Sequence, residues 1–125
     1  MHVKTFFQIG SILAGIAVAA GAFGAHGLKA RVSPELLDTW DKAVRYQMYH
    51  ALAFLALAWA ITQWPAQGKL WGLAGWFFLA GVLFFSGSLY ILVLSGLKWL
   101  GAVTPLGGVA FVIGWGCLLV AAARS

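Results

Sequence analysis

Two phenols and an imidazole lie one helical turn apart, where the charged part of the chain gives way to a long apolar run. Tyr46, Tyr49 and His50 share one face of a helix, because side chains three and four positions apart are neighbours. Carried into hydrocarbon, such groups must find hydrogen-bond partners inside the protein, since lipid offers none. The chemistry expected of this face is hydrogen bonding, with metal ligation by the imidazole as an alternative.

The elements that carry this face can be predicted from composition. The chain has 125 residues, of which 62% are hydrophobic and 9% charged, unlike a soluble domain. Four uncharged runs, at 5–28, 46–68, 70–97 and 99–123, each exceed the roughly 20 residues that span a hydrocarbon core. We therefore expect an all-α polytopic membrane protein with a single domain, 1–125, whose four spans lie at about 5–25, 46–64, 70–94 and 99–123.

A short amphipathic interfacial helix is predicted in loop 1, over about 33–45. Ser33 can cap this helix, and Pro34 suits its first position. Trp40 is then expected to anchor the helix in the lipid headgroup region. No helix breaker separates this segment from the second span, so the two could form one helix that bends near Arg45 or continues straight beyond the membrane.

Most of the polar side chains within the spans fall in the leaflet that contains loops 1 and 3. One interpretation is a polar cavity open to the loop side, and the alternative is that these groups lock the helices together, at well under about 2 kcal/mol per contact. In either case His50 is expected near Ser86 or Tyr90, with Thr104 close by. The candidate ligand-binding residues of this polar cluster are His26, Tyr46, Gln47, Tyr49, His50, Ser86, Ser88, Tyr90 and Thr104.

Signatures of metal, haem and enzyme sites are weak. Zinc needs a third and a fourth ligand, and the single cysteine, Cys117, lies in the far half of the last span. A bis-histidine haem would need His26 and His50 in one pocket, yet their depths differ by a turn or more. No carboxylate lies within a span, and no nucleophile elbow, phosphate-binding loop or HExxH motif is present. We expect no catalytic residue, no metal and no cofactor, and keep a histidine-ligated metal or haem protein as a minor alternative.

The expected partners follow from the charges and the small residues. The net charge is +5, but the lysines and arginines flank the spans, which indicates membrane lipids and not nucleic acid. Small residues recur along the first span, at Gly10 and Ala14 and at Ala17, Gly21 and Ala25, and such stripes allow two helices to approach closely. We expect this contact within the chain, with a homo-oligomer through small-residue faces as the alternative.

Four motifs, in order along the chain, resemble a known family. They are GAFGAHGL at 21–28, YQMYHAL at 46–52, FSGSLY at 85–90 and TPLGG at 104–108. They are similar to the pattern of the transmembrane-protein-256 / domain-of-unknown-function-423 family, and the resemblance covers essentially the whole chain. It implies a four-helix protein of the bacterial inner membrane. It implies no activity, because none is established for that family.

The function predicted from these residues is binding or movement of a lipid or small amphiphile through a polar cavity in the loop-1 leaflet. A structural or assembly protein with a purely helix-locking polar cluster is the alternative. Lysine and arginine are more frequent on the side of loops 1 and 3 than on the side of the termini, which predicts cytoplasmic loops 1 and 3 and termini outside the cytoplasm. The first set is Lys29, Arg31, Lys42, Arg45 and Lys98, and the second is Lys4, Lys69 and Arg124.

Overall fold

The computed structural model describes residues 2–125, and within that range every regular element is helical. The α-helices are α1 (Val3–Phe23), α2 (Pro34–Gln63), α3 (Gly68–Gly81), α4 (Gly87–Ser95) and α5 (Thr104–Arg124). Two π-helical turns extend this pattern: Gly24–Leu28 continues α1, and Val82–Ser86 joins α3 to α4 in one rod. Short 3-10 turns, Pro65–Gln67 and Lys98–Ala102, lead into α3 and α5.

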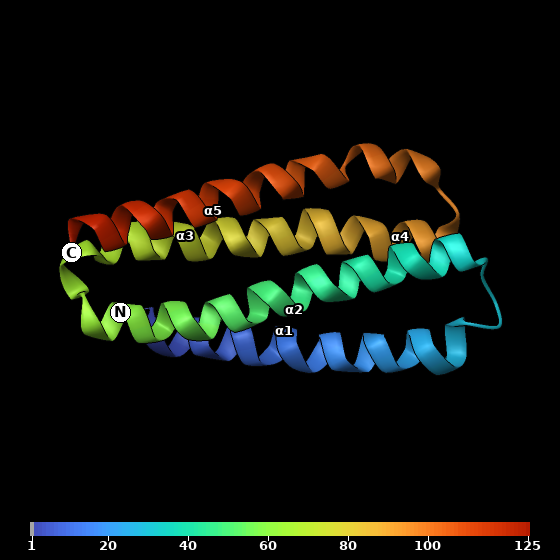
Figure 1. Cartoon of the computed structure of the whole chain (residues 1–125), viewed down its shortest axis with the longest axis horizontal. Coiled ribbons are helices and arrows are strands. Elements are labelled where there is room, and N and C mark those ends of the chain that lie inside the picture. The colour runs from blue at the N-terminus through green and yellow to red at the C-terminus, as the bar shows by residue number, and fades with distance from the viewer. Residues whose placement is uncertain (1) are drawn as a thin grey trace.

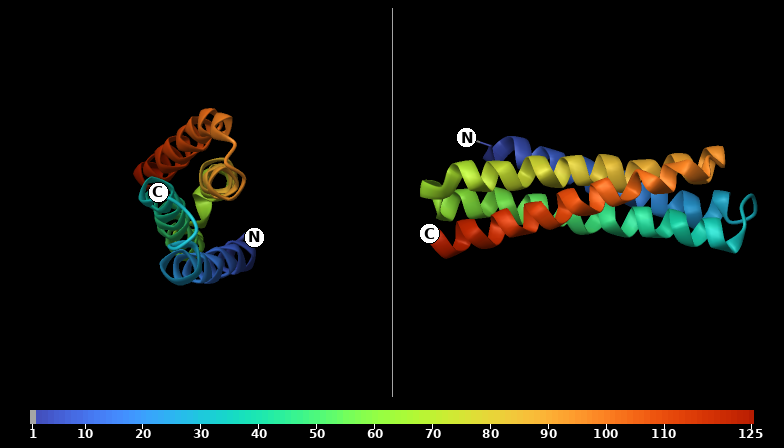
Figure 2. Two further views of the ribbon diagram at one scale, coloured as in Figure 1. Left: turned by 90° about the vertical axis from the view of Figure 1, so that its right-hand side faces the viewer. Right: turned by 90° about the horizontal axis from the view of Figure 1, so that it is seen from above.

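The helices form four long rods that run side by side. Figure 1 shows α1 lying along α2, and α3 lying along α5. The end-on view in Figure 2 shows these two pairs next to each other, and α2 joins them through its contacts with α4 and with the π-helical turn at 82–86. Both termini lie at one end of the molecule, and the connections after residues 28 and 95 lie at the other, which we call the loop-1 end (Figure 1).

Three of the four rods suit a membrane by length and composition. Within the described residues these segments are Val3–Leu28, Pro65–Ser95 and Lys98–Arg124. This confirms an all-helical chain with apolar helices of membrane-spanning length. α2 is not among the three, because charged residues in its first turns and the polar group around Tyr46 and His50 lower its hydropathy.

The segment at 33–45 is not a short helix of its own but the beginning of α2, which is the alternative of one continuous helix. Its start is as predicted: the Leu36 N–H donates to Ser33 Oγ at 3.2 Å, and Pro34 lies in the first turn. The helix then continues to Gln63 as one element of 30 residues, about 45 Å long. Trp40 is not a headgroup anchor, because it is buried and its indole N–H donates to Ala20 O at 2.8 Å. With no breaker before Trp64, the residues at 34–45 pack as the first half of α2.

Glycines mark the places where the rods approach most closely. A Cβ atom on Gly10 of α1 would lie 2.8 Å from Ala51 O of α2, and one on Gly24 would meet the Trp40 ring. On the other pair, a Cβ on Gly107 of α5 would run into the backbone of Phe85. Gly10 of the predicted small-residue face therefore lies against α2 of the same chain, as expected, whereas Ala25 of that face is exposed.

Candidate functional site

Gln47 ties three rods together from α2. Its Nε2 donates to Leu13 O of α1 at 2.8 Å, and its Oε1 accepts a hydrogen bond of 2.7 Å from the Tyr90 hydroxyl of α4. The side chain is buried, so both ends of the amide depend on these partners for hydrogen bonding. Two of the predicted site residues, Gln47 and Tyr90, are therefore brought into direct contact.

His50 is held on both of its ring nitrogens. Nδ1 lies 2.7 Å from Tyr46 O, and Nε2 accepts a 3.1 Å hydrogen bond from the Trp115 indole N–H of α5. The Phe111 ring stacks on the imidazole, with centroids 3.6 Å apart and an angle of 8° between the planes. The carbonyl requires a donor and the indole requires an acceptor, so the proton is on Nδ1 and the lone pair of Nε2 is used by Trp115. A metal would have to displace Trp115 to reach this histidine.

The serines make further ties between rods. Ser86 is fully buried in the π-helical turn at 82–86, and its hydroxyl donates to Ala43 O of α2 at 2.7 Å. The Ser88 and Thr104 hydroxyls lie 2.7 Å apart and join α4 to α5. Among residues 2–125, every buried side-chain nitrogen or oxygen has a hydrogen-bond partner. These polar groups satisfy one another and nearby carbonyls, as the helix-locking alternative requires.

The predicted residues do not all lie at one level along the rods: Thr104 begins α5 at the loop-1 end, whereas Gln47 and His50 lie further in. Gln47 lies level with Leu13 and His50 level with Trp115, near the middles of α1 and α5. The continuous α2 explains the difference, because its first three turns carry Tyr46 and His50 away from the loop-1 end. His50 bonds to Trp115 and not to Ser86, Tyr90 or Thr104.

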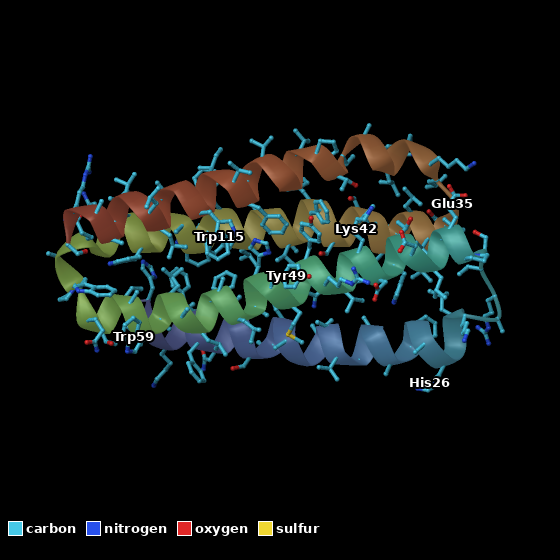
Figure 3. The ribbon with its side chains drawn as sticks, viewed as in Figure 1. His26, Glu35, Lys42, Tyr49, Trp59 and Trp115 are labelled. Carbon is cyan, nitrogen blue, oxygen red and sulfur yellow. The ribbon has the colours of Figure 1, made fainter. Side chains whose placement is uncertain are left out.

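Three of the predicted site residues lie on the outer surface. His26 is exposed in the π-helical turn that ends the first rod, far from the middle of the bundle (Figure 3). Tyr49 is 55% exposed and Tyr46 is 38% exposed, although the Tyr46 ring also stacks on Phe85 with centroids 4.4 Å apart. The structure does not bring these three side chains together around an internal cavity.

Sequence reasoning missed Trp115 and Phe111, which form the surroundings of His50. Trp115 offered a signal, because tryptophan is enriched at the membrane interfaces and this one lies in the middle of an apolar run. An indole N–H at that depth needs an acceptor from the protein.

A groove of about 360 Å³ opens at the loop-1 end, between the end of the first rod and the start of α2. Its lining includes Trp40, Gly21 and Gly24. Asp38 and Asp41 also line it, and Asp41 pairs with Arg45. None of the nine predicted site residues lines this groove, whose remaining lining residues are Ala25, Pro34 and Leu37.

The groove can bind a cation more readily than an anion. It combines apolar lining residues with two carboxylates, so an ammonium group that entered it would find a charge partner, whereas the Trp40 side chain is buried. Among residues 2–125, no three His, Cys, Asp or Glu side chains come close enough together to hold a metal ion.

Comparison with known proteins gives consistent matches along the chain. The model of the family described as "Protein of unknown function (DUF423)" matches residues 20–108. A UPF0382 membrane protein of Staphylococcus aureus (strain bovine RF122 / ET3-1) is 50% identical over 119 residues, which is 95% of either chain. The UPF0382 membrane protein YwdK of Bacillus subtilis (strain 168) is 45% identical over 122 residues, 98% of each. No solved structure matches the chain.

Proposed function

Because this chain belongs to the DUF423 family, whose members have no assigned function and whose relatives here are bacterial membrane proteins, we propose that it binds a lipid or small amphiphile in the groove at the loop-1 end. The observation that carries the proposal is the groove itself, whose lining combines apolar residues with the carboxylates of Asp38 and Asp41. The occupant is an amphiphile with a positively charged head group, such as the ammonium of an ethanolamine lipid.

The groove has the size and character of a small-molecule site. Its volume of about 360 Å³ falls within the range of roughly 300–1,000 Å³ usual for ligand pockets. The three acidic residues of the chain, Glu35, Asp38 and Asp41, all lie in the first turns of α2. Lysines and arginines at 29, 31, 42 and 45 lie in the same part of the chain and Asp41 is paired with Arg45, which leaves Asp38, among residues 2–125, as the groove carboxylate without an ion-pair partner.

The placement in the membrane is part of the same proposal. In this proposal all four rods cross the bacterial inner membrane, and α2 is the fourth span; the side-by-side arrangement of the four rods supports it (Figure 1). The excess of lysines and arginines around loops 1 and 3 favours a loop-1 end in the cytoplasmic leaflet and termini outside the cytoplasm. The groove then faces the cytoplasmic headgroup region.

The test uses the whole protein in nanodiscs of phosphatidylethanolamine and phosphatidylglycerol, followed by native mass spectrometry of the released protein. The unaltered protein should retain phosphatidylethanolamine. Asp38→Asn should lower that retention by roughly tenfold, the effect of losing one charge-assisted hydrogen bond. Glu35→Gln is the matched control, since Glu35 is an exposed carboxylate of the same segment outside the groove lining.

A steric variant tests the same site without changing its charge. A Cβ on Gly21 would be in ordinary van der Waals contact, 3.5 Å from Val44, so Gly21→Leu should fill the groove while the helix stays intact. It should abolish retention. Retention of both lipids in their bulk ratio, unchanged by either variant, would contradict the proposal.

The second candidate is a structural or assembly protein of the membrane. It is favoured by the ties at Gln47, His50 and Ser86, whose buried polar atoms all find partners among the described residues. A protein of this kind would retain no lipid selectively, and its polar variants would change only stability.

A further inference from the structure

A second groove lies at the opposite end of the molecule, where the termini and the connection from α2 to α3 are found (Figure 1). Its volume is about 260 Å³, and we call it the terminal groove. It is lined by His2, Gly68, Lys69, Gly72, Leu73 and Trp76. All of these except His2 belong to the first three turns of α3. The terminal groove therefore combines two nitrogen-bearing side chains with apolar ones.

The imidazole of His2 is positioned by packing at the start of α1. It stacks on the buried Phe6 ring, with centroids 5.2 Å apart and 21° between the planes. It also meets the Trp76 ring, with centroids 5.9 Å apart and the planes at 85°. A Cβ atom on Gly72 would lie 3.2 Å from His2 Cδ2, so the imidazole lies close against the α3 backbone. An imidazole N–H in this position can donate to an anionic oxygen.

The α3 residues of the terminal groove change from charged to apolar along the helix. Lys69, Leu73 and Trp76 share one face of α3, at spacings of four and three residues. Lys69 is exposed in the first turn, and Leu73 and Trp76, about 6 and 10 Å further along, are 47% and 44% exposed. Because Pro65–Ser95 suits a membrane span, the ammonium is at the headgroup level and the apolar pair is further in. A phospholipid has the same order, with its phosphate outside and its acyl chains inside.

The side-chain charges near the terminal groove have one sign. The acidic residues of the chain are Glu35, Asp38 and Asp41, all at the loop-1 end. The lysines and arginine at the end with the termini are Lys4, Lys69 and Arg124. An anion in the terminal groove would therefore be attracted by cations without competition from a side-chain carboxylate. The ammonium of an ethanolamine lipid would find no side-chain carboxylate to pair with there.

We propose that the terminal groove binds the phosphate of an anionic phospholipid such as phosphatidylglycerol. The Lys69 ammonium pairs with the phosphate, and the His2 N–H donates to one of its oxygens. The acyl chains extend inward along Leu73 and Trp76. This site is distinct from the groove at the loop-1 end, because the two lie at opposite ends of the rods and have linings of opposite charge.

The test uses the whole protein in nanodiscs of phosphatidylethanolamine and phosphatidylglycerol, followed by native mass spectrometry of the released protein. Lys69→Gln should lower the retention of phosphatidylglycerol by roughly fivefold, the effect of one basic residue near anionic lipid. Lys4→Gln is the matched control, since Lys4 is an exposed lysine at the same end outside the groove lining, and it should leave retention unchanged. Equal losses for the two variants, or no loss for Lys69→Gln, would overturn the site.

A steric variant tests the terminal groove without changing its charge. Gly68 lines the groove, and nothing lies within 4 Å of a Cβ atom placed on it, so Gly68→Leu should fill the groove and leave α3 intact. It should abolish the retention of phosphatidylglycerol. Gly116→Leu is the control, because Gly116 of α5 is equally open and lies outside the groove. Retention that survives Gly68→Leu would contradict the proposal.

Excess inorganic phosphate distinguishes a lipid site from a site for a soluble anion. A lipid that also contacts Leu73 and Trp76 should remain bound in its presence, whereas displacement by inorganic phosphate would overturn the lipid assignment. Asp38→Asn should leave the retention of phosphatidylglycerol unchanged, and Lys69→Gln should leave that of phosphatidylethanolamine unchanged. A failure at one groove is therefore distinguishable from a failure at the other.

Discussion

The Trp115 indole donates a 3.1 Å hydrogen bond to Nε2 of His50, and this bond joins the middle of α5 to the middle of α2. The two residues are 65 positions apart in the chain. α2 and α5 belong to different helix pairs, so the bond ties one pair to the other. Phe111, one turn before Trp115, stacks on the same imidazole and adds an apolar contact to the polar one.

Loss of this bond should lower the free energy of unfolding modestly and leave the fold intact. His50→Leu keeps roughly the side-chain volume and should cost about 0.5–2 kcal/mol, the range for one hydrogen bond within a membrane protein. Trp115→Phe removes the donor of the same bond and should lower the free energy of unfolding by a similar amount. The double variant should lose clearly less than the sum of the two single losses. Unfolding in increasing fractions of SDS measures these differences. Trp99→Phe, at an exposed tryptophan, is the control, and strict additivity of the two changes would contradict the bond.

The tautomer of His50 is a separate prediction. Its contacts with Tyr46 O and with the Trp115 N–H require a neutral ring with hydrogen on Nδ1. Nitrogen NMR of ¹⁵N-histidine-labelled protein should show a protonated Nδ1 and an unprotonated Nε2, with a through-bond coupling from Trp115. A ring with hydrogen on Nε2 would mean that the indole bond does not form. Trp115→Phe should shift the Nε2 resonance while Trp99→Phe leaves it unchanged.

Gln47 should be the most sensitive of the polar residues. Gln47→Leu removes one hydrogen bond to Leu13 O and another from Tyr90, and leaves both partners in an apolar environment. We expect a loss of about 1–3 kcal/mol, measured by SDS unfolding. Gln8→Leu is the matched control, because Gln8 is exposed on α1, and it should have little effect. Equal losses for the two variants would show that the hydrogen bonds of Gln47 to the neighbouring rods contribute little to stability.

Two adjacent glycines of α5 should respond in opposite ways to alanine. A methyl group on Gly107 would run into backbone atoms of Phe85 and Gly81, which cannot move aside as a side chain can, so Gly107→Ala should destabilise by about 1–3 kcal/mol. Gly108 has nothing within 4 Å of the corresponding position, and Gly108→Ala should be neutral or stabilising by up to about 1 kcal/mol from helix propensity. Similar effects of the two changes would contradict the packing of α5 against the π-helical turn.

Membrane orientation can be measured directly. A reporter that is active only outside the cytoplasm, fused after Ser125, should be active, and the same reporter in the loop between α1 and α2 should be silent. The reason is the excess of lysine and arginine around loops 1 and 3. The reverse pattern would place the lipid groove in the opposite leaflet.

Composition and local motifs were enough to predict the class of the protein and the ends of its helices. Long uncharged runs predict membrane-length helices, because hydrocarbon admits few other structures. Ser33 and Pro34 predict the start of α2, and Trp64-Pro65 its end, because capping and loss of a backbone donor act within one turn. The family resemblance was also readable from four short motifs and is confirmed by the match to DUF423.

The position of each polar residue along the rods, and the group to which it hydrogen-bonds, could be read only from the folded chain. Whether 33–45 lies on the membrane or continues the second span depends on what covers its apolar side, and Trp40 bonding to Ala20 O is a contact between distant parts of the chain. Because 33–45 forms the first part of α2, Gln47 and His50 lie near the middle of the bundle. There Gln47 bonds to Leu13 O and Tyr90, and His50 bonds to Trp115. Helical periodicity fixes which residues share a face, but it does not fix the axial offset of one helix against another. The offset is set by side-chain packing over the whole length of the rods, and it decides which polar groups meet.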